Sequence, residues 1–282
     1  MKKTQWLALF QDIKATIVSF LSIMLFVALG IGVFLGIKWN EPALTKTTSV
    51  YYDAHSFHDF ALSFAYGFTQ EDVERVEALE EVAVAEGGYS AHGTTWVGGK
   101  RYVLAIQSLT ERIDTTDVLS GALPTGDNEV GVERLFAEAA GLQIGDTLTI
   151  DTGSGKSARL GRTELTVTGV VEHPSYIRPE THTRGLSNIG DGTVNYYIVA
   201  PKAAFQPEAY DNCFSQIVIR GVGMAGLNTF GPAYEARSAA VAEQLRELGR
   251  ERAPLRSDAV FARYSDEIAQ GEEKLRDAES EL

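Results

Sequence analysis

The sequence predicts an α+β fold, with one transmembrane helix ahead of a mixed domain and the start of a coiled coil behind it. The 23 positions from 15 to 37 hold no charged side chain. Strand patterns then outnumber helix patterns without alternating strictly with them, which favours α+β over doubly wound α/β. Near the C-terminal end, apolar residues recur every seven positions. We therefore expect four parts: a stub at 1–14, a span at 15–37, a domain at 40–257 and a coiled-coil segment at 258–282.

The uncharged run is long enough to cross a bilayer. As a helix it extends roughly 34 Å at about 1.5 Å per residue, against about 30 Å for the hydrocarbon core. A cleaved signal peptide has a shorter apolar region followed by small residues, whereas here the run is followed by Lys38-Trp39-Asn40-Glu41-Pro42. We expect a retained anchor, with Trp39 in the interfacial aromatic belt.

The charges on either side of this run predict its orientation. Three lysines and the terminal amine precede it, opposed by Asp12, whereas Lys38 and Lys46 follow it. This bias favours a cell-membrane protein with a cytoplasmic N-terminus and an extracytoplasmic main domain. The stub is either an amphipathic segment lying on the inner surface or a polar extension of the same helix.

Composition excludes several classes of function. The net charge of −13 argues against nucleic acid as a partner and against peripheral binding to anionic lipid. The single cysteine, Cys213, cannot form an internal disulfide or a thiolate metal cluster, so we expect it to be a small buried hydrophobic residue. A domain of over 200 residues can bury enough apolar surface without such cross-links.

The first half of the domain combines strands with one helix. Aromatic and alternating apolar residues predict strands at 50–57 and 59–64. Thr69 is expected to be the N-cap of a helix, followed by acids in the first turn. The apolar stripe of this helix comprises Val73, Val76 and Leu79. Two further strands, at 82–97 and 101–109, are joined by a Gly98-Gly99 hairpin turn.

The second half continues with short strands between two helices. An Ala-rich helix is expected around 133–140, with Gly141 as its C′ residue. The expected strands lie at 147–151, 164–171, 195–200 and 216–220. A helix over 232–250 has Pro232 in its first turn. Its apolar face comprises Tyr234, Val241, Leu245 and Leu248.

The heptads of the last segment predict a coiled-coil seam. The a positions are Phe261, Ile268, Leu275 and Leu282, and the d positions are Tyr264, Gly271 and Ala278. A seam needs a partner helix, and the pattern stops at Leu282 without a capping residue. We therefore expect a fragment of a longer protein, with a terminal dimerisation helix as the alternative.

One glycine-rich stretch resembles the end of a phosphate-binding loop. It reads Gly153-Ser154-Gly155-Lys156-Ser157, but Ile150 stands where the motif requires its first glycine. A phosphate-binding loop also needs a helix after it, whereas residues 159–171 have a strand pattern. We interpret the stretch as a hairpin loop without nucleotide.

The histidines do not predict a catalytic or metal site. His55 and His58 are expected in a strand or turn, where they point to opposite faces, and no third ligand is evident. His173 and His182 flank a loop with two prolines, which we expect to be a stiff surface excursion without an acid–base pair. Because no hydrolase or metalloprotease motif occurs either, we expect no catalytic, cofactor-binding or metal-binding residue and no enzyme.

Two stretches resemble the extracytoplasmic core domain of FtsX-like permeases, the MacB class of ABC transporters. The second of them reads Val167-Thr168-Gly169-Val170-Val171, followed by 196–205. The first stretch contains Gly145-Asp146, which is a structural turn. That first stretch comprises Leu119-Ser120-Gly121-Ala122-Leu123-Pro124, Asn128-Glu129-Val130-Gly131-Val132, Ala137, Gly141-Leu142 and Ile144-Gly145-Asp146-Thr147-Leu148.

The resemblance implies the N-terminal portion of a permease subunit that works with a separate cytoplasmic ATPase. In that family, ATP-driven movement is transmitted to the domain outside, for export or for activation of an extracytoplasmic partner. It implies a homodimer or a second permease half, an extracytoplasmic protein or peptide partner, and ATP hydrolysis outside this chain. The alternative is a single-pass anchored binding or sensor protein that dimerises through its C-terminal helix.

Overall fold

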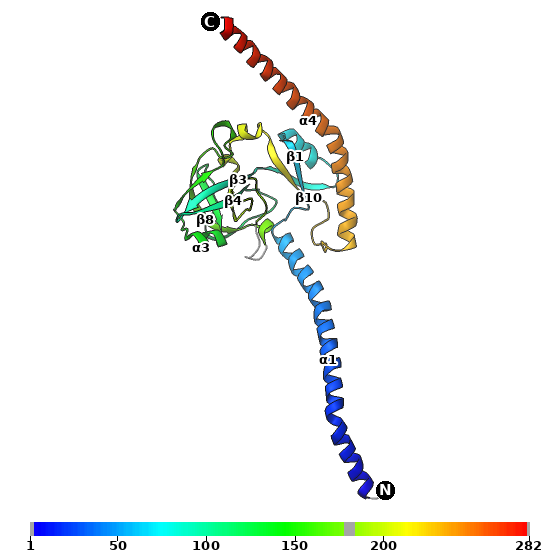
Figure 1. The fold of residues 1–282 in the computed structure, drawn as a ribbon. Coiled ribbons are helices and arrows are strands. Elements are labelled where there is room, and N and C mark those ends of the chain that lie inside the picture. Colours follow the sequence, from blue (N-terminus) through cyan, green and yellow to red (C-terminus); the bar gives the residue numbers. More distant parts are fainter. Residues whose placement is uncertain (1–2, 178–183, 281–282) are drawn as a thin grey trace.

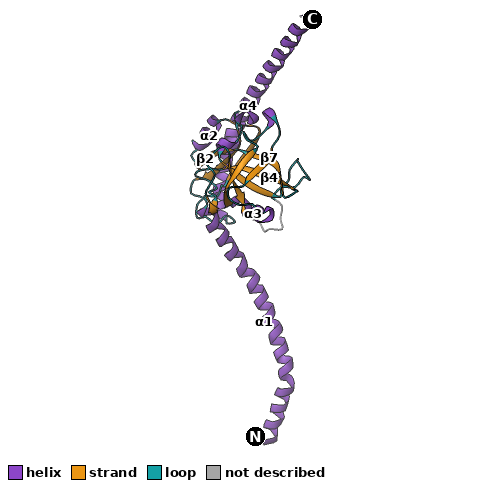
Figure 2. Ribbon diagram, turned by 90° about the vertical axis from the view of Figure 1, so that its left-hand side faces the viewer, coloured by secondary structure: helices purple, strands orange, loops and turns teal. Residues whose placement is uncertain are grey.

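The computed structural model describes residues 3–177 and 184–280, in which two long helices leave opposite ends of a central domain (Figure 1). Helix α1 spans Lys3–Ala54 and helix α4 spans Pro232–Ser280. Between them, two β-sheets form the domain, and the predicted α+β class is confirmed. Both views show α1 and α4 projecting far beyond the sheets (Figure 2).

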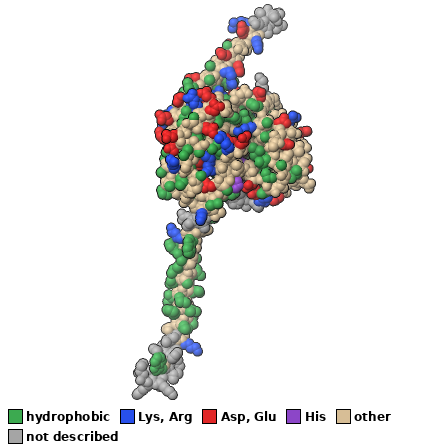
Figure 3. All heavy atoms as spheres, turned by 180° about the vertical axis from the view of Figure 1, so that it is seen from behind, with side chains coloured by type: hydrophobic (Ala, Val, Ile, Leu, Met, Phe, Trp, Pro, Cys, Tyr) green, Lys and Arg blue, Asp and Glu red, His purple; other side chains and the backbone are tan. Residues whose placement is uncertain are grey.

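One helix in the described part of the chain is long and apolar enough to cross a membrane, over Thr16–Ala54. Its hydrophobic side chains are exposed all round, and Figure 3 shows them as a column below the domain. The helix is continuous from Lys3, so the stub is an extension of the same helix rather than a segment separated by a turn. Figure 2 shows that α1 is curved along its length.

The strand predicted at 50–57 is wrong, because its first residues complete α1. The aromatic residues that suggested a strand pack locally instead. The rings of Tyr52 and Phe57 stack with centroids 4.4 Å apart, which packs the last turn of α1 against the linker that follows. The next predicted strand is confirmed with a longer range, as β1 over Phe60–Phe68.

The smaller sheet has three antiparallel strands in the order β1-β10-β2. Strand β2 spans Val82–Gly88 and β10 spans Phe214–Gly221. Helix α2, over Gln70–Glu77, and the first half of α4 pack on one face of this sheet. Their shared core contains the buried side chains of Val73, Val76, Val82, Ala85, Ile217, Ile219, Met224, Val241 and Leu245.

The start of α2 confirms the predicted N-cap. The Thr69 side chain accepts a hydrogen bond from the Asp72 backbone N–H at 3.2 Å, and the Asp72 carboxylate accepts one from the Thr69 N–H at 2.8 Å. This reciprocal capping box satisfies two amides that the helix leaves unpaired. Val73 and Val76 are buried as predicted, and Leu79 packs against the same core.

The larger sheet closes on itself. Its order is β5-β8-β6-β9-β4-β3-β7, and β7 also pairs with β8, so six strands form a barrel while β5 lies outside on β8. The β4–β9 and β6–β8 pairs are parallel and the others antiparallel. The strands are β3 (Ser90–Val97), β4 (Lys100–Ser108), β5 (Asp117–Gly121), β6 (Glu129–Glu133), β7 (Thr147–Asp151), β8 (Glu164–Glu172) and β9 (Tyr196–Ala200).

Helix α3, over Arg134–Ala140, packs against the barrel core. Phe136 is fully buried between the rings of Tyr102 and Tyr196. The helix ends at Gly141 with a φ of 68°, a left-handed conformation that glycine adopts at little cost, and this confirms the predicted helix end. The strands predicted at 147–151, 164–171, 195–200 and 216–220 are also confirmed, within two residues at each end.

The strand predicted at 82–97 is in fact two strands in different sheets. The chain leaves β2 at Gly88 and enters β3 at Ser90, and Tyr89 fills the space between the sheets against Phe205, Tyr210 and Phe214. The Gly98-Gly99 hairpin is confirmed, with both φ values positive. At the other end of the domain, α4 runs without interruption through Pro254 into the predicted coiled-coil segment.

Candidate functional site: the junction between α1 and the domain

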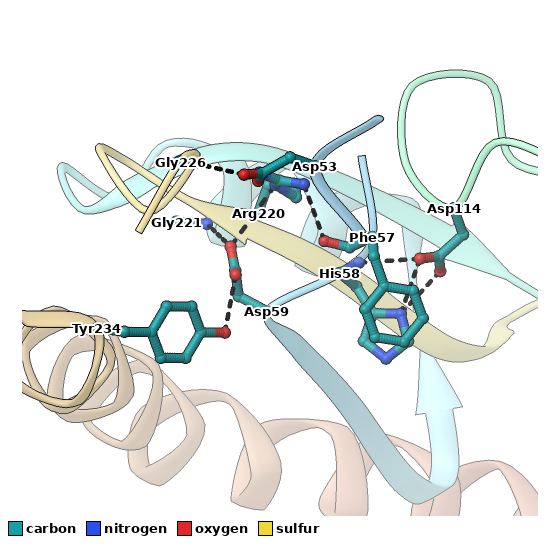
Figure 4. Close-up of polar contacts among 9 residues, drawn as sticks. All are labelled: Asp53, Phe57, His58, Asp59, Asp114, Arg220, Gly221, Gly226 and Tyr234. Atoms are coloured by element: carbon teal, nitrogen blue, oxygen red, sulfur yellow. Dashed lines mark hydrogen bonds and ion pairs between the residues drawn. The ribbon is translucent and has the colours of Figure 1, made fainter. Parts of the chain in front are cut away.

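Arg220 joins the end of α1 to the small sheet (Figure 4). One of its terminal nitrogens donates to the Asp53 carboxylate of α1 at 3.2 Å, and the other to the Phe57 carbonyl at 3.1 Å. Its Nε lies 3.7 Å from the Asp59 carboxylate. The side chains of Arg220 and Asp59 are only 12% and 8% exposed, so solvent screens this ion pair weakly.

The two carboxylates extend the network to α4. Asp59 accepts from the Tyr234 hydroxyl of α4 and from the Gly221 backbone N–H, both at 2.9 Å. Asp53 accepts from the Gly226 N–H at 2.8 Å. Burial and the nearby Asp59 carboxylate raise the pKa of Tyr234, so its hydroxyl stays protonated as a donor. The junction therefore connects α1, the residue before β1, β10 and α4 through Arg220 and Asp59.

A second set of contacts joins the α1–β1 linker to the start of β5 and to the segment before it. The His58 Nδ1 lies 2.8 Å from one oxygen of Asp114, and the His58 N–H donates to the other at 2.9 Å. His55 lies 2.7 Å from the Asp117 carboxylate through Nε2. Both histidines thus point toward the same part of the chain, around Asp114 and Asp117, whereas the sequence predicted that they point to opposite faces of a strand or turn. Among the described residues, no group of three or more His, Cys, Asp or Glu could hold a metal ion.

His173 lies buried beside these histidines. Burial lowers its pKa to about 4, so the ring is neutral at physiological pH, and Nδ1 accepts from the Ser175 N–H. His173 and Pro174 are both buried, which corrects the prediction of a surface excursion at the start of this loop. His182 and residues 178–183 around it lie outside the described residues.

A cavity of about 510 Å³ separates α1 from the barrel beside the junction. Its wall on the barrel side holds an ion pair between Arg184 and Glu133, whose side chains are only 3% and 4% exposed. Glu133 also accepts from the Tyr197 N–H at 3.1 Å, which fixes the segment around Arg184 to the barrel. The wall on the side of α1 is formed by Thr47, Thr48 and Tyr51.

The other sequence candidates are structural. Residues 153–157 form a loop with a short 3-10 turn, and strand β8 follows instead of the helix that a phosphate site needs. Cys213 is buried as predicted, and its Sγ lies 2.9 Å from an Arg256 nitrogen. At the Gly145-Asp146 turn, the Asp146 carboxylate accepts from the Gln143 N–H at 2.8 Å.

The heptad residues of α4 begin where the helix still contacts the domain and continue along the part that projects from it. Phe261, Tyr264, Ile268 and Leu275 are all exposed. Phe261 also contacts the ring of Tyr66, with centroids 6.0 Å apart, and so marks where the helix leaves the small sheet. The side chain of Ala278 and all of Leu282 lie outside the described part of the chain.

Sequence reasoning did not identify the junction residues. Asp53 and Arg220 are 167 positions apart, and Asp59 and Tyr234 are 175 apart, so no local motif contains them. The available signal was Arg220 itself, a charged residue at the end of the apolar strand Ile217-Val218-Ile219. An arginine that is largely shielded from solvent at a strand end requires a carboxylate partner, but only the strand pairing shows which one.

Comparisons with known proteins find similarity in solved structures only. No protein-family model matches the chain, and no curated protein matches it. The extracellular domain of the noncanonic ABC-type transporter YknZ from Gram-positive bacteria is 12% identical, with a TM-score of 0.38 over 57% of this chain and 76% of that one. The periplasmic region of MacB from Actinobacillus actinomycetemcomitans is 13% identical, with a TM-score of 0.37 over 66% and 75%.

Proposed function

We propose that this chain is the N-terminal portion of a permease subunit of an FtsX/MacB-like ABC transporter. Its role is to couple ATP hydrolysis in a partner ATPase to export or mechanical work by the domain outside the membrane. One observation carries the proposal: the apolar helix α1 continues to Ala54 and is joined there, through Arg220, to both β10 and Asp59. A helix that served only as a membrane anchor would not need ion pairs that fix its end to the small sheet.

The resembling stretch supports the same assignment. Residues 119–148 include the end of β5, all of β6 and α3 and the start of β7, so they form a continuous part of the barrel and its attached strand. Gly121 has a φ of 76°, and an added Cβ there would lie 2.2 Å from the Thr168 carbonyl oxygen. The glycine is therefore required by close backbone packing, which is a physical reason for that position of the signature.

The proposed mechanism is a rigid-body transmission of movement. A shift of α1 in the membrane pulls on Asp53, and Arg220 passes the displacement to the small sheet through Asp59. Tyr234 then connects Asp59 to α4, which leaves the domain on the side opposite α1 (Figure 1). Packed elements transmit small displacements of this kind because their cores are not continuously deformable.

The proposal includes several partners. A cytoplasmic ABC ATPase would supply the movement, with the N-terminus of this chain on the cytoplasmic side. The proposal also includes a homodimer or a second permease half. An extracytoplasmic protein or peptide would receive the output near α4. In this proposal the chain itself catalyses no reaction.

A second candidate is a single-pass anchored binding or sensor protein that dimerises through α4. The exposed seam residues Phe261, Ile268 and Leu275 favour it, because a projecting helix with an apolar face requires a partner. The two candidates differ in whether an ATPase binds.

The test is co-purification of the full-length protein, in mild detergent, with an ABC ATPase encoded beside it. We expect a stable complex whose ATPase rate depends on the junction. Arg220→Lys keeps the charge but loses the two-pronged geometry, so it should keep the complex and reduce the stimulated rate. Arg162→Lys is the matched control, since Arg162 pairs with Asp127 on the exposed barrel surface. Failure of the ATPase to co-purify would refute the permease assignment.

A further inference from the structure

The ring of His55 faces two acceptors at the end of α1. Its Nδ1 lies 2.8 Å from the Tyr51 carbonyl oxygen, and its Nε2 lies 2.7 Å from the Asp117 carboxylate. Neither oxygen can donate a hydrogen bond. A neutral imidazole carries one N–H and can satisfy only one of the two contacts, whereas an imidazolium carries two and satisfies both.

The position of His55 at the helix end favours the same charge. It follows Ala54 directly, at the C-terminal end of α1, which carries the partial negative charge of the helix dipole. The backbone completes a cap there: Ser56 has a φ of 49°, and the Phe57 N–H donates to the Tyr52 carbonyl at 2.8 Å. A cation at this position is stabilised by the helix dipole.

The titratable groups around His55 come from every neighbouring element. The linker brings His58, the segment before β5 brings Asp114, and β5 itself begins with Asp117. Strand β8 contributes Glu172, which is the ladder partner of Asp117, and His173 follows it. Arg134 of α3 pairs with Glu172. The acidic groups outnumber the cations, since His173 is neutral and His58 bonds to Asp114.

We propose that His55 is a proton-operated clamp, which holds the end of α1 to β5 through two charged contacts when protonated and holds it more weakly when neutral. Loss of one proton removes one of the two ring contacts and the positive charge that attracts the Asp117 carboxylate, so the contact with Asp117 is weakened. The linker has a further attachment that does not involve the ring, because the Thr115 N–H donates to the His55 carbonyl at 2.9 Å. The change is therefore confined to the orientation of α1 relative to β5.

The sign of the pH dependence follows from the direction of the shift. Burial lowers the pKa of His55, but the hydrogen bonds to Tyr51 and Asp117 outweigh it and raise the pKa above its ordinary value. The clamp is then fully stabilised below the ordinary histidine pKa of about 6.5. It weakens as pH rises through the raised value. A role in transmission rests on the proposed function, whereas the titration does not.

His58 provides a matched control within the same linker. Its contact with Asp114 uses one ring nitrogen, Nδ1, so a neutral ring that carries its hydrogen there keeps the bond. His58→Asn preserves a donor at that place and should leave the pH response intact. His55→Gln and Asp117→Asn each remove the second charged contact and should abolish it.

The test uses the full chain in lipid nanodiscs and two readouts. Histidine NMR gives the midpoint of His55, and spin labels at Val50 and Leu119, both exposed, give the distance between α1 and β5. We expect the midpoint to lie above that of the denatured chain and the distance distribution to broaden across the same pH range. Asp117→Asn should lower the midpoint and make the distribution independent of pH.

Two results would overturn the clamp: a His55 midpoint at or below the denatured value, or a distance distribution that stays unchanged across the His55 titration. Persistence of the response in both His55→Gln and Asp117→Asn would likewise assign it to other groups. These outcomes are separate from the ATPase test. If the ATPase fails to bind while His55 titrates as expected, the clamp stands and the permease assignment falls.

Discussion

Replacing Arg220 with methionine tests whether the junction is a structural connection. Methionine keeps much of the side-chain volume and removes the positive charge. Asp59 would keep its bonds from Gly221 and Tyr234 but would lose the cation that compensates its charge. Asp53 would lose its contact with β10 and keep only the Gly226 N–H. The expected result is a less stable domain whose connection to α1 is loosened.

The size of the effect follows from burial. Removing one partner of a buried ion pair costs about 3–5 kcal/mol, because the other charge is left uncompensated. Asp53 is 34% exposed, so water screens its share, and the two remaining bonds to Asp59 lessen the penalty there. We therefore expect the lower end, about 3 kcal/mol. For a domain of this size, that corresponds to a fall in melting temperature of roughly 6–12 °C.

Thermal unfolding of the full chain in detergent, followed by near-ultraviolet circular dichroism, measures this change. Asp53→Asn is the internal comparison and should cost less than about 1 kcal/mol, as partly exposed pairs do. Adding Asp59→Asn to Arg220→Met should recover stability, because it removes the uncompensated charge. The reasoning is refuted if Arg220→Met costs no more than Asp53→Asn, or if the double variant is less stable than the single one.

Three further predictions concern the rest of the fold. Thr69→Ala removes half of the capping box and should cost about 1 kcal/mol of unfolding free energy in chemical denaturation. Gly121→Ala should lower the melting temperature much more than Gly98→Ala: both residues have positive φ, which costs about 1–2 kcal/mol for alanine, but only the first added Cβ meets backbone. Equal effects would contradict the packing argument. Replacing exposed Ile268 and Leu275 with Asp should leave the domain's melting temperature unchanged while abolishing any association through α4, as measured by sedimentation.

Local features of the fold were predictable from the sequence. The Thr69 cap, the end of α3 at Gly141 and the Gly98-Gly99 hairpin depend on residues within a few positions of one another. Their hydrogen bonds form within one turn, so composition and spacing are enough to indicate them. The uncharged run from 15 to 37 likewise predicts a membrane-spanning helix from its own length and composition.

Features that depend on distant pairing were not predictable. Tyr89 separates two strands because the sheets on either side diverge there, although the apolar pattern continues across it. Closure of the barrel requires β7 to pair with both β3 and β8. The 50–57 strand prediction failed because aromatic residues suit either a strand or a helix end that packs on a domain. Tertiary packing decided each case.

The same limit explains the candidate site. The sequence indicated a membrane helix and a domain, but the residues that join them come from four elements. The spacing of His55 and His58 suggests at most a pair of metal ligands. Their actual partners, Asp117 and Asp114, lie about sixty positions away in the sequence. Only the tertiary structure brings them beside the α1–β1 linker.

If the domain is moved as we propose, the length of α1 beyond the predicted span sets how far it moves. Seventeen residues, 38–54, extend α1 beyond Ile37, which adds a helical length of roughly 26 Å at about 1.5 Å per residue. A change in tilt of about 10°, well within the range of membrane helices, swings the end of this extension through roughly 4–5 Å. That displacement is close to the pitch of one helical turn. A small change in the tilt of the helix would therefore displace its end, where Arg220 binds, by nearly one turn.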